Sequence, residues 1–262
     1  MTNISTKAVL PTFRLEGQVA LVTGAGRGIG AAIAQCYAAS GAEVVLVART
    51  KSELDAVAAL IAESGGTAIV RVCDVTDSAA VRQLIGGLSR LDIVVNNAGT
   101  NIPEPFLDVS DEHLDALIDL NTRAVFVVAQ AAVAKMRQSS DQQVQRGVVI
   151  NISSQMGHIG SPNRTVYCMT KHAVEGLTKA MAIELAPEGI RVNSIGPTFV
   201  DTPLVRKIVN TPEKLEFLVS KIPLGHMASV TDIAAAAVYL ASPAAAMVTG
   251  TCLLVDGGWT AQ

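Results

Sequence analysis

Along this chain, seven short apolar runs alternate with segments of helical periodicity. The runs lie at residues 19–22, 44–47, 68–72, 93–95, 148–152, 190–194 and 252–255. They are continuously apolar instead of alternating with polar residues, which indicates strands buried on both faces. Such strands alternating with helices predict an α/β fold of the Rossmann type: a doubly wound parallel sheet with helices on both faces.

No linker rich in proline, glycine or serine divides the 262 residues, so we expect one domain over 17–262 after an N-terminal extension at 1–16. Expected helices include one that Gly41 ends, one over 52–64 capped by Ser52, and one over 231–241. The stretch 198–225 has no clean period. We interpret it as a substrate loop or lid, or as a pair of short helices.

Charge and hydropathy exclude several classes of protein. The net charge is -3 at pH 7 and no basic run is present, which argues against nucleic acid as a partner. The first sixteen residues lack the apolar core of a secretion signal, and no stretch reaches the roughly 18 apolar residues of a membrane span. The longest candidate, 124–134, is interrupted by Gln130. We expect a soluble, cytoplasmic protein.

The four cysteines are Cys36, Cys73, Cys168 and Cys252. They are far apart, form no CxxC motif, and have no histidine at the spacing of metal ligands. We therefore expect reduced thiols and no metal site.

A glycine-rich turn follows the first apolar run, with Gly24, Gly28 and Gly30 in TGAGRGIG. Glycines there permit a tight turn, close approach to a diphosphate, and packing of the next helix, whose amino end favours anionic oxygens. The spelling is not GxGxxG, and a turn of this kind can be a mere loop. Its place between a strand and a helix indicates a dinucleotide site.

Two arginines bear on the choice of dinucleotide. Arg49 stands after the second apolar run, where an acidic residue usually binds the ribose hydroxyls, and an arginine there suits a 2′-phosphate. Arg27, inside the turn, can reach the same phosphate from the other side. The pair favours NADP(H) over NAD(H), the alternative being two solvated surface charges.

Tyr167 and Lys171 are four residues apart in a predicted helix, and Ser154 follows the run at 148–152. A phenol with a pKa near 10 is a poor acid–base catalyst at neutral pH, but an ammonium one helix turn away stabilises its phenolate. Ser154 can donate a hydrogen bond to a substrate oxygen. Each residue alone is unremarkable in a helix or loop. Together with the glycine turn, they predict an oxidoreductase that pairs a hydride carrier with a proton donor.

With these residues the chain resembles the short-chain dehydrogenase/reductase family, of the classical type, over almost its whole length. The matching motifs are TGAGRGIG at 23–30, CDV at 73–75, NNAG at 96–99, Asn121, SSQMG at 153–157, YCMTK at 167–171 and NSIGPTFVDT at 193–202. The resemblance implies that Ser154 polarises a carbonyl and Tyr167 transfers the proton. It implies that Lys171 lowers the tyrosine pKa and holds the nicotinamide ribose, and that Asn121 holds a water linked to Lys171.

The resemblance also implies which residues contact the cofactor and the substrate. The cofactor set is Gly24, Arg27, Gly28, Ile29, Gly30, Arg49, Asp74, Val75, Asn97, Ala98, Gly99, Tyr167, Lys171, Pro197, Val200 and Thr202. The substrate set is Ser154, Gln155, Asn163, Tyr167 and Thr198. Thr198 stands where the family usually has glycine, so the pocket shape departs from the family pattern. Alternatively, the NNAG motif is only a strand-to-helix turn, and Asn121 is a satisfied interior amide that interrupts a helix.

Three stretches bear on the substrate: FRLEGQVALVTGAG, NNAGTNIPEPFLDVS and PTFVDTPL. They are most similar to family members that act on polyols and sugar acids, of the gluconate 5-dehydrogenase kind. They are less similar to 3-oxoacyl-(acyl-carrier-protein) reductases, for which Arg123, Lys135 and Arg137 are candidate carrier contacts, although these residues are equally plausible as solvated helix charges. A catalytically silent, cofactor-sensing interaction protein is the alternative from another class. The VDGGW segment at 255–259 resembles the family's last strand and turn, which implies a homotetramer.

Overall fold

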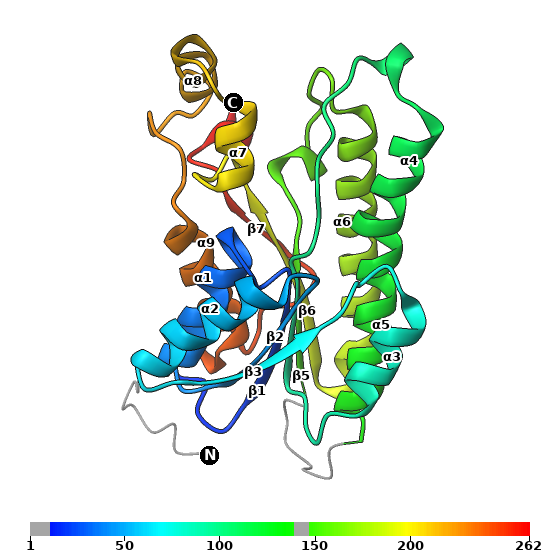
Figure 1. Ribbon diagram of the computed structural model, residues 1–262, viewed down its shortest axis with the longest axis vertical. Helices are drawn as coiled ribbons and strands as arrows, with labels where there is room; N and C mark the ends of the chain where they lie inside the picture. The colour runs from blue at the N-terminus through cyan, green and yellow to red at the C-terminus, as the bar shows by residue number, and fades with distance from the viewer. Residues whose placement is uncertain (1–10, 139–146) are drawn as a thin grey trace, which may run out of the picture.

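The computed structural model of the protein describes residues 11–138 and 147–262, with the backbone alone at 204, 207 and 208. Seven parallel strands form one sheet in the order β3-β2-β1-β4-β5-β6-β7 (Figure 1). The strands are β1 (Val19–Thr23), β2 (Glu43–Ala48), β3 (Thr67–Val72), β4 (Ile93–Asn96), β5 (Gly147–Ile152), β6 (Ile190–Pro197) and β7 (Cys252–Val255). The strand order reverses between β1 and β4, the place where doubly wound sheets bind ligands. The predicted fold class is confirmed.

Two layers of helices cover the sheet (Figure 1). One face carries α1 (Gly28–Ala39), α2 (Lys51–Glu63) and α9 (Val230–Ala241); the other carries α3 (Ser78–Gly86), α5 (Ala124–Met136) and α6 (Thr165–Leu185). Each layer encloses its own apolar core. Leu21 and Val22 are neighbours in β1 and enter opposite cores. This arrangement is the physical reason why the strand sequences are continuously apolar.

A continuous helical segment over 111–136 joins α4 (Asp111–Ile118), the five-residue π-helix η2 (Asp119–Arg123) and α5. Within the described residues it is the one helix long and apolar enough to cross a membrane by length and composition, and half of its most apolar window is buried inside the protein. The sequence predicted only the apolar stretch 124–134. The segment packs through α5 against α3, β4 and β5, as a core helix does.

The stretch 198–225 contains α7 (Pro203–Ile208) and α8 (Pro212–Val219), as one of the two interpretations predicted. Each helix has proline in its first turn and a threonine N-cap, Thr202 or Thr211, whose side chain accepts a backbone hydrogen bond. The short 3-10 turns are η1 (Phe106–Asp108), η3 (Gln155–Gly157), η4 (Ala186–Glu188), η5 (Pro243–Ala245) and η6 (Trp259–Ala261). That 198–225 serves as a lid stays a prediction.

Two boundaries differ from the sequence expectations. The N-cap of α2 is Thr50, so Ser52 lies inside the helix instead of capping it. Leu15, in the predicted N-terminal extension, is fully buried in the core, and its N–H donates to the carbonyl of Ser40 over 2.7 Å. The packed domain therefore begins before residue 17, while residues 1–10 of the extension lie outside the described residues.

Candidate active site

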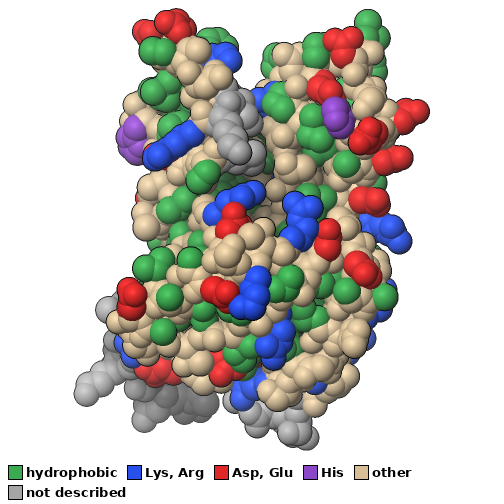
Figure 2. Space-filling view, in the orientation of Figure 1, with side chains coloured by type: hydrophobic (Ala, Val, Ile, Leu, Met, Phe, Trp, Pro, Cys, Tyr) green, Lys and Arg blue, Asp and Glu red, His purple; other side chains and the backbone are tan. Residues whose placement is uncertain are grey.

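The predicted site residues gather at the edge formed by the carboxyl ends of the strands, here called the carboxyl edge. Figure 2 shows this end of the molecule hollowed between the part that carries α7 and α8 and the part that carries α4. Each strand from β1 to β6 is followed directly by predicted site residues. These are Gly24 after β1, Arg49 after β2, and Asp74 and Val75 after β3. They continue with Asn97, Ala98 and Gly99 after β4, Ser154 and Gln155 after β5, and Thr198, Val200 and Thr202 after β6, which ends at Pro197. The topology thus brings distant motifs to one edge.

The glycine turn after β1 has a backbone that only glycine accommodates. Gly24 and Gly28 have φ values of +64° and +57°. A Cβ on Gly30 would lie 2.3 Å from the carbonyl oxygen of Gly24, which leaves no room for a side chain. Asn97 holds the turn in place, because its Nδ2 donates to the carbonyls of Thr23 (2.9 Å) and Gly24 (3.2 Å).

The helix that follows this turn, α1, presents an open amino end. Its N-cap is Arg27, and within the described residues no side chain caps its first amides and its first turn contains no acidic residue. In contrast, Ser229 and Asp232 form a capping box at the start of α9. Free amides and a positive helix dipole beside a glycine turn fit the diphosphate of a dinucleotide. Ile29 continues α1 and packs against the core.

Both arginines expected at the adenosine end lie close to carboxylates. Arg27 Nη1 is 2.8 Å from Glu53 Oε1, and Arg49 Nη1 is 3.9 Å from Asp74 Oδ2. Hydrogen bonds from Thr76, with a smaller contribution from Arg49, hold the pKa of Asp74 below its usual range. The side chains of Arg27 and Arg49 are 70% and 76% exposed, so a bound phosphate has access to them but competes with these carboxylates.

Ser154, Tyr167 and Lys171 converge at the end of β5. Ser154 is the N-cap of η3, and its Oγ accepts from the N–H of Met156 over 3.1 Å and hydrogen-bonds the phenol of Tyr167. Lys171 Nζ lies 5.5 Å from the centroid of the Tyr167 ring and donates to the carbonyl of Ile152 over 2.9 Å. The hydroxyl pair and the ammonium therefore lie close together at the carboxyl edge.

The pKa values in this cluster differ from the expectation that Lys171 makes the phenol acidic. Burial raises the pKa of Tyr167 to about 12, opposed by the hydrogen bond with Ser154 and by the charge of Arg164. Lys171 is not among the causes of this shift in the described structure, where its Nζ donates to the Ile152 carbonyl. Burial lowers the pKa of Lys171 to about 8, opposed by Glu175. Without cofactor the phenol stays protonated at neutral pH, the state that a proton donor requires.

Ketone reduction is therefore expected to fall as the pH rises through about 8. Below that pH Lys171 is charged, and Tyr167 keeps its proton because its pKa is about 12. Above it the neutral amine no longer stabilises negative charge at the phenol, so kcat/KM declines by up to about tenfold per pH unit. A pH profile measures this effect, with Lys171→Arg as the comparison because arginine stays charged and shifts the decline upward. A profile flat from about pH 6 to 10 would contradict the assignment.

Asn121 lies in η2 and is fully buried. Its Oδ1 accepts from the N–H of Thr100 over 3.0 Å, and its Nδ2 donates to the Thr100 carbonyl (2.8 Å) and to Thr170 Oγ1 (3.3 Å). A Cβ on Gly99 would lie 3.1 Å from Asn121 Oδ1 and 3.9 Å from Lys171 Nζ, so the amide is close to the lysine. These contacts are those of an interior amide that interrupts a helix, and its role in holding a water stays a prediction.

The predicted substrate residues differ in burial: Thr198 and Gln155 are buried, and Asn163 is exposed. Thr198 Oγ1 and Gln155 Nε2 are buried and have no hydrogen-bond partner within the described part of the chain. Buried polar atoms are rarely left unpaired in a folded protein, so both are available to a ligand. Asn163 is exposed, has a φ of +58°, and its carbonyl accepts from the N–H of Glu104 over 3.1 Å.

Arg164 is a site residue that the sequence did not indicate. It precedes α6 as its N-cap, and its charge lowers the pKa of Tyr167. Its Nε is buried without a hydrogen-bond partner in the described ranges, and burial lowers the pKa of the guanidinium. A half-buried arginine beside a reacting phenol suits an anionic substrate group. Its Nη1 donates to the Asn163 carbonyl over 3.2 Å, and no spacing rule along the sequence marks such a residue.

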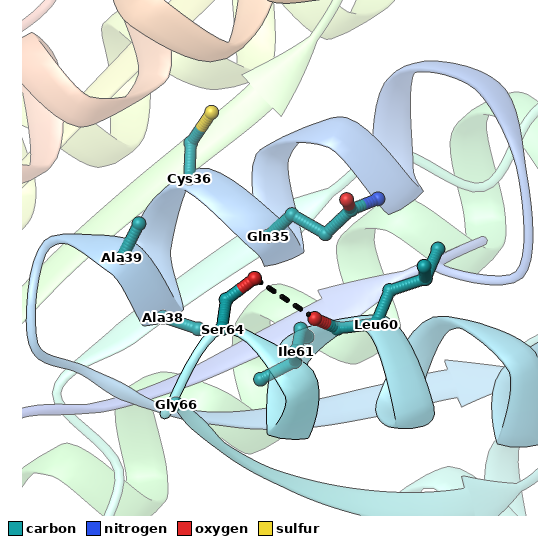
Figure 3. Close-up of a pocket in the computed structure, with 8 residues that line it drawn as sticks. All are labelled: Gln35, Cys36, Ala38, Ala39, Leu60, Ile61, Ser64 and Gly66. Atoms are coloured by element: carbon teal, nitrogen blue, oxygen red, sulfur yellow. Dashed lines mark hydrogen bonds between the residues drawn. The ribbon is translucent and has the colours of Figure 1, made fainter.

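A separate pocket lies between α1 and α2 (Figure 3). It is lined by Gln35, Cys36, Ala38, Ala39, Leu60, Ile61, Ser64 and Gly66. Its one marked hydrogen bond runs from Ser64 Oγ to the Leu60 carbonyl over 3.1 Å. The lining is mostly apolar, contains no charged side chain and includes none of the predicted site residues, so it carries no part of the proposed chemistry.

Comparison with known proteins agrees with the geometry. A family model described as enoyl-(acyl carrier protein) reductase matches residues 24–260. L-xylulose reductase of Bos taurus is 41% identical over 248 residues, covering 95% of this chain and 98% of the relative.

Two solved structures are similar to this chain in both fold and sequence. A short-chain type dehydrogenase/reductase of Mycobacterium marinum superposes with a TM-score of 0.88 at 40% identity, over 95% of this chain and 98% of the other. A gluconate 5-dehydrogenase of Burkholderia cenocepacia in complex with NADP and tartrate superposes with a TM-score of 0.90 at 35% identity, over 97% and 99%. The chain belongs to the short-chain dehydrogenase/reductase family and is an oxidoreductase of alcohol and ketone groups.

Proposed function

We propose that the protein interconverts a ketone and a secondary alcohol in a small polyol or sugar acid, using NADP(H). The observation that carries the proposal is the convergence of the Ser154 and Tyr167 hydroxyls with the Lys171 ammonium at the carboxyl edge, where the glycine turn also lies. The names of L-xylulose reductase and gluconate 5-dehydrogenase support substrates with several hydroxyl groups.

In this proposal each side chain has one task. The Ser154 hydroxyl donates to the substrate oxygen and orients the carbonyl. The Tyr167 phenol gives its proton to that oxygen as negative charge develops there, and Lys171 stabilises the resulting phenolate. Bound NADPH supplies the hydride to the carbonyl carbon. The buried Thr198 and Gln155 groups hold hydroxyls of the substrate, and the stretch 198–225 closes over it.

The preference for NADP(H) rests on Arg49 and Arg27 at the adenosine end of the glycine turn. A phosphate there would bind two guanidinium groups, and guanidinium–phosphate pairs are among the stronger polar contacts in proteins. NADP in the Burkholderia enzyme supports the same choice.

The acyl-carrier reductase is the second candidate, and the candidate carrier contacts give it little support. Arg123 pairs with Asp119 at 3.6 Å, Lys135 bonds Gln138 at 3.3 Å, and Arg137 pairs with Glu188. These side chains are engaged with neighbours on their own surfaces. The homotetramer and the cytoplasmic location stay predictions that follow from family likeness and composition.

A substrate panel tests the proposal by the loss of NADPH absorbance with L-xylulose, 5-ketogluconate and an acetoacetyl thioester. We expect the sugar ketones to give the higher kcat/KM, and Arg164→Gln to raise KM for the ketogluconate by about tenfold while changing the neutral ketose less than about threefold. Faster reduction of the thioester would favour the acyl-carrier alternative. Sound NADPH binding with no turnover of any ketone would favour the cofactor-sensing alternative.

A further inference from the structure

A second cluster of polar side chains, His158, Glu175 and Cys252, lies beside η3 and outside the proposed catalytic set. The three residues come from the loop after η3, from α6 and from β7. Their imidazole nitrogen, carboxylate oxygen and sulfur atoms all lie within 4.8 Å of one another, and His158 Nε2 is 3.8 Å from Glu175 Oε1. Among the described residues this is the one group of its kind.

Glu175 has an unsatisfied carboxylate oxygen directed at the other two residues. The residue is only 5% exposed. Its Oε2 accepts from Ser194 Oγ over 2.8 Å, whereas its Oε1 is buried and has no hydrogen-bond partner in the described ranges. A buried carboxylate oxygen is costly unless a proton donor or a cation satisfies it. The Cys252 thiol is a proton donor to this carboxylate, and a cation that displaces the thiol proton would satisfy both groups.

We propose that His158, Glu175 and Cys252 bind a divalent cation of the zinc class, with the fourth coordination position open to water. One nitrogen, one oxygen and one sulfur ligand form a donor set that zinc accepts, while magnesium and calcium prefer oxygen alone. Zinc–ligand bonds of about 2.0 to 2.3 Å in tetrahedral geometry place ligand atoms about 3.3 to 3.8 Å apart. The observed spacing needs shifts of less than about 1 Å, and the exposed side of His158 gives the ion access.

Binding must break the S–H bond of Cys252 as the metal–sulfur bond forms, and the proton leaves to solvent. Burial, with a further contribution from Glu175, raises the pKa of this thiol to about 12, opposed by the hydrogen bond with Ser194 and by the charge of Lys179. Zinc affinity is therefore expected to rise with pH. The bound ion would connect the segment after Ser154 to α6, which carries Lys171 four residues before Glu175.

Calorimetric titration of the metal-free, tag-free protein with Zn²⁺ tests the site, and Co²⁺ gives a thiolate charge-transfer band as a second readout. We expect one ion per chain and a loss of affinity of at least about tenfold in both Cys252→Ser and His158→Asn. Cys36→Ser removes a thiol in the pocket of Figure 3 and should leave binding unchanged.

His158 is partly exposed, so His158→Asn keeps the fold and remains decisive if Cys252→Ser does not fold. Absence of Zn²⁺ binding and of the Co²⁺ band in the parent protein would overturn the proposal. Binding that survives both substitutions would overturn it as well. Neither readout depends on turnover, so this test is independent of the proposed function.

Discussion

Tyr167→Phe is expected to lower kcat for ketone reduction by about 10²- to 10⁴-fold, the usual contribution of a positioned proton donor. The substitution removes only the hydroxyl that hydrogen-bonds Ser154. It keeps the aromatic ring, whose centroid lies 5.5 Å from Lys171 Nζ. The fold and NADPH affinity should therefore change little. Steady-state kinetics with a reactive ketone, together with NADPH fluorescence titration, measure the two effects separately.

Tyr239→Phe is the matched control, because this tyrosine lies in α9 on the opposite side of the domain core and packs near Phe13. It should retain the parent kcat. If Tyr167→Phe reduced its ketone as fast as the parent, the proton would have to come from another group, and the role assigned to the phenol would be wrong.

Arg49→Ala is expected to weaken NADPH binding by about 10- to 100-fold, the range for losing a charged hydrogen-bonding partner of a phosphate. In the parent protein Arg49 Nη1 lies 3.9 Å from Asp74 Oδ2, so the substitution also leaves the negative charge of Asp74 without this cation near the bound phosphate. NADH affinity should change less than about threefold, since NADH carries no 2′-phosphate. Fluorescence titration with both dinucleotides gives the ratio directly.

Two further variants sharpen this prediction. Glu53→Gln removes the carboxylate that holds Arg27 at 2.8 Å, and should tighten NADPH binding severalfold. Arg137→Ala removes an arginine at the C-terminal end of α5 that pairs with Glu188. It should change neither NADPH affinity nor NADH affinity. An equal loss of NADPH and NADH affinity in Arg49→Ala would refute the phosphate assignment.

Much of the fold could be predicted because strands buried on both faces leave a distinct sequence pattern. The strands β1 and β5 begin and end within a residue of their apolar runs. The helix α4 was missed because its sequence is polar and its continuation into α5 passes through the π-helix at Asn121. That irregular turn is held by hydrogen bonds to Thr100, a contact that local sequence does not reveal.

The candidate site was predictable where spacing along one helix or after one strand defines it, as for Ser154, Tyr167 and Lys171. The pKa values were not, because desolvation depends on what the rest of the chain packs around each group. Cys252 lies 77 residues after Glu175, and the two meet only because β7 pairs with β6 at Ser194. The sequence expectation of no metal site considered local spacing alone, and so did not include the three residues of the proposed zinc site.

In the proposed reaction, a carbonyl group at the carboxyl edge receives a hydride from NADPH and a proton from Tyr167. Product analysis after reduction of a sugar ketone with C4-deuterated NADPH tests it most directly. We expect one deuterium on the new carbinol carbon of the product from the parent protein and from Tyr239→Phe, and about 10²- to 10⁴-fold slower transfer by Tyr167→Phe. An alcohol without deuterium from either C4-deuterated epimer of NADPH, or equal deuterium transfer by Tyr167→Phe, would contradict it.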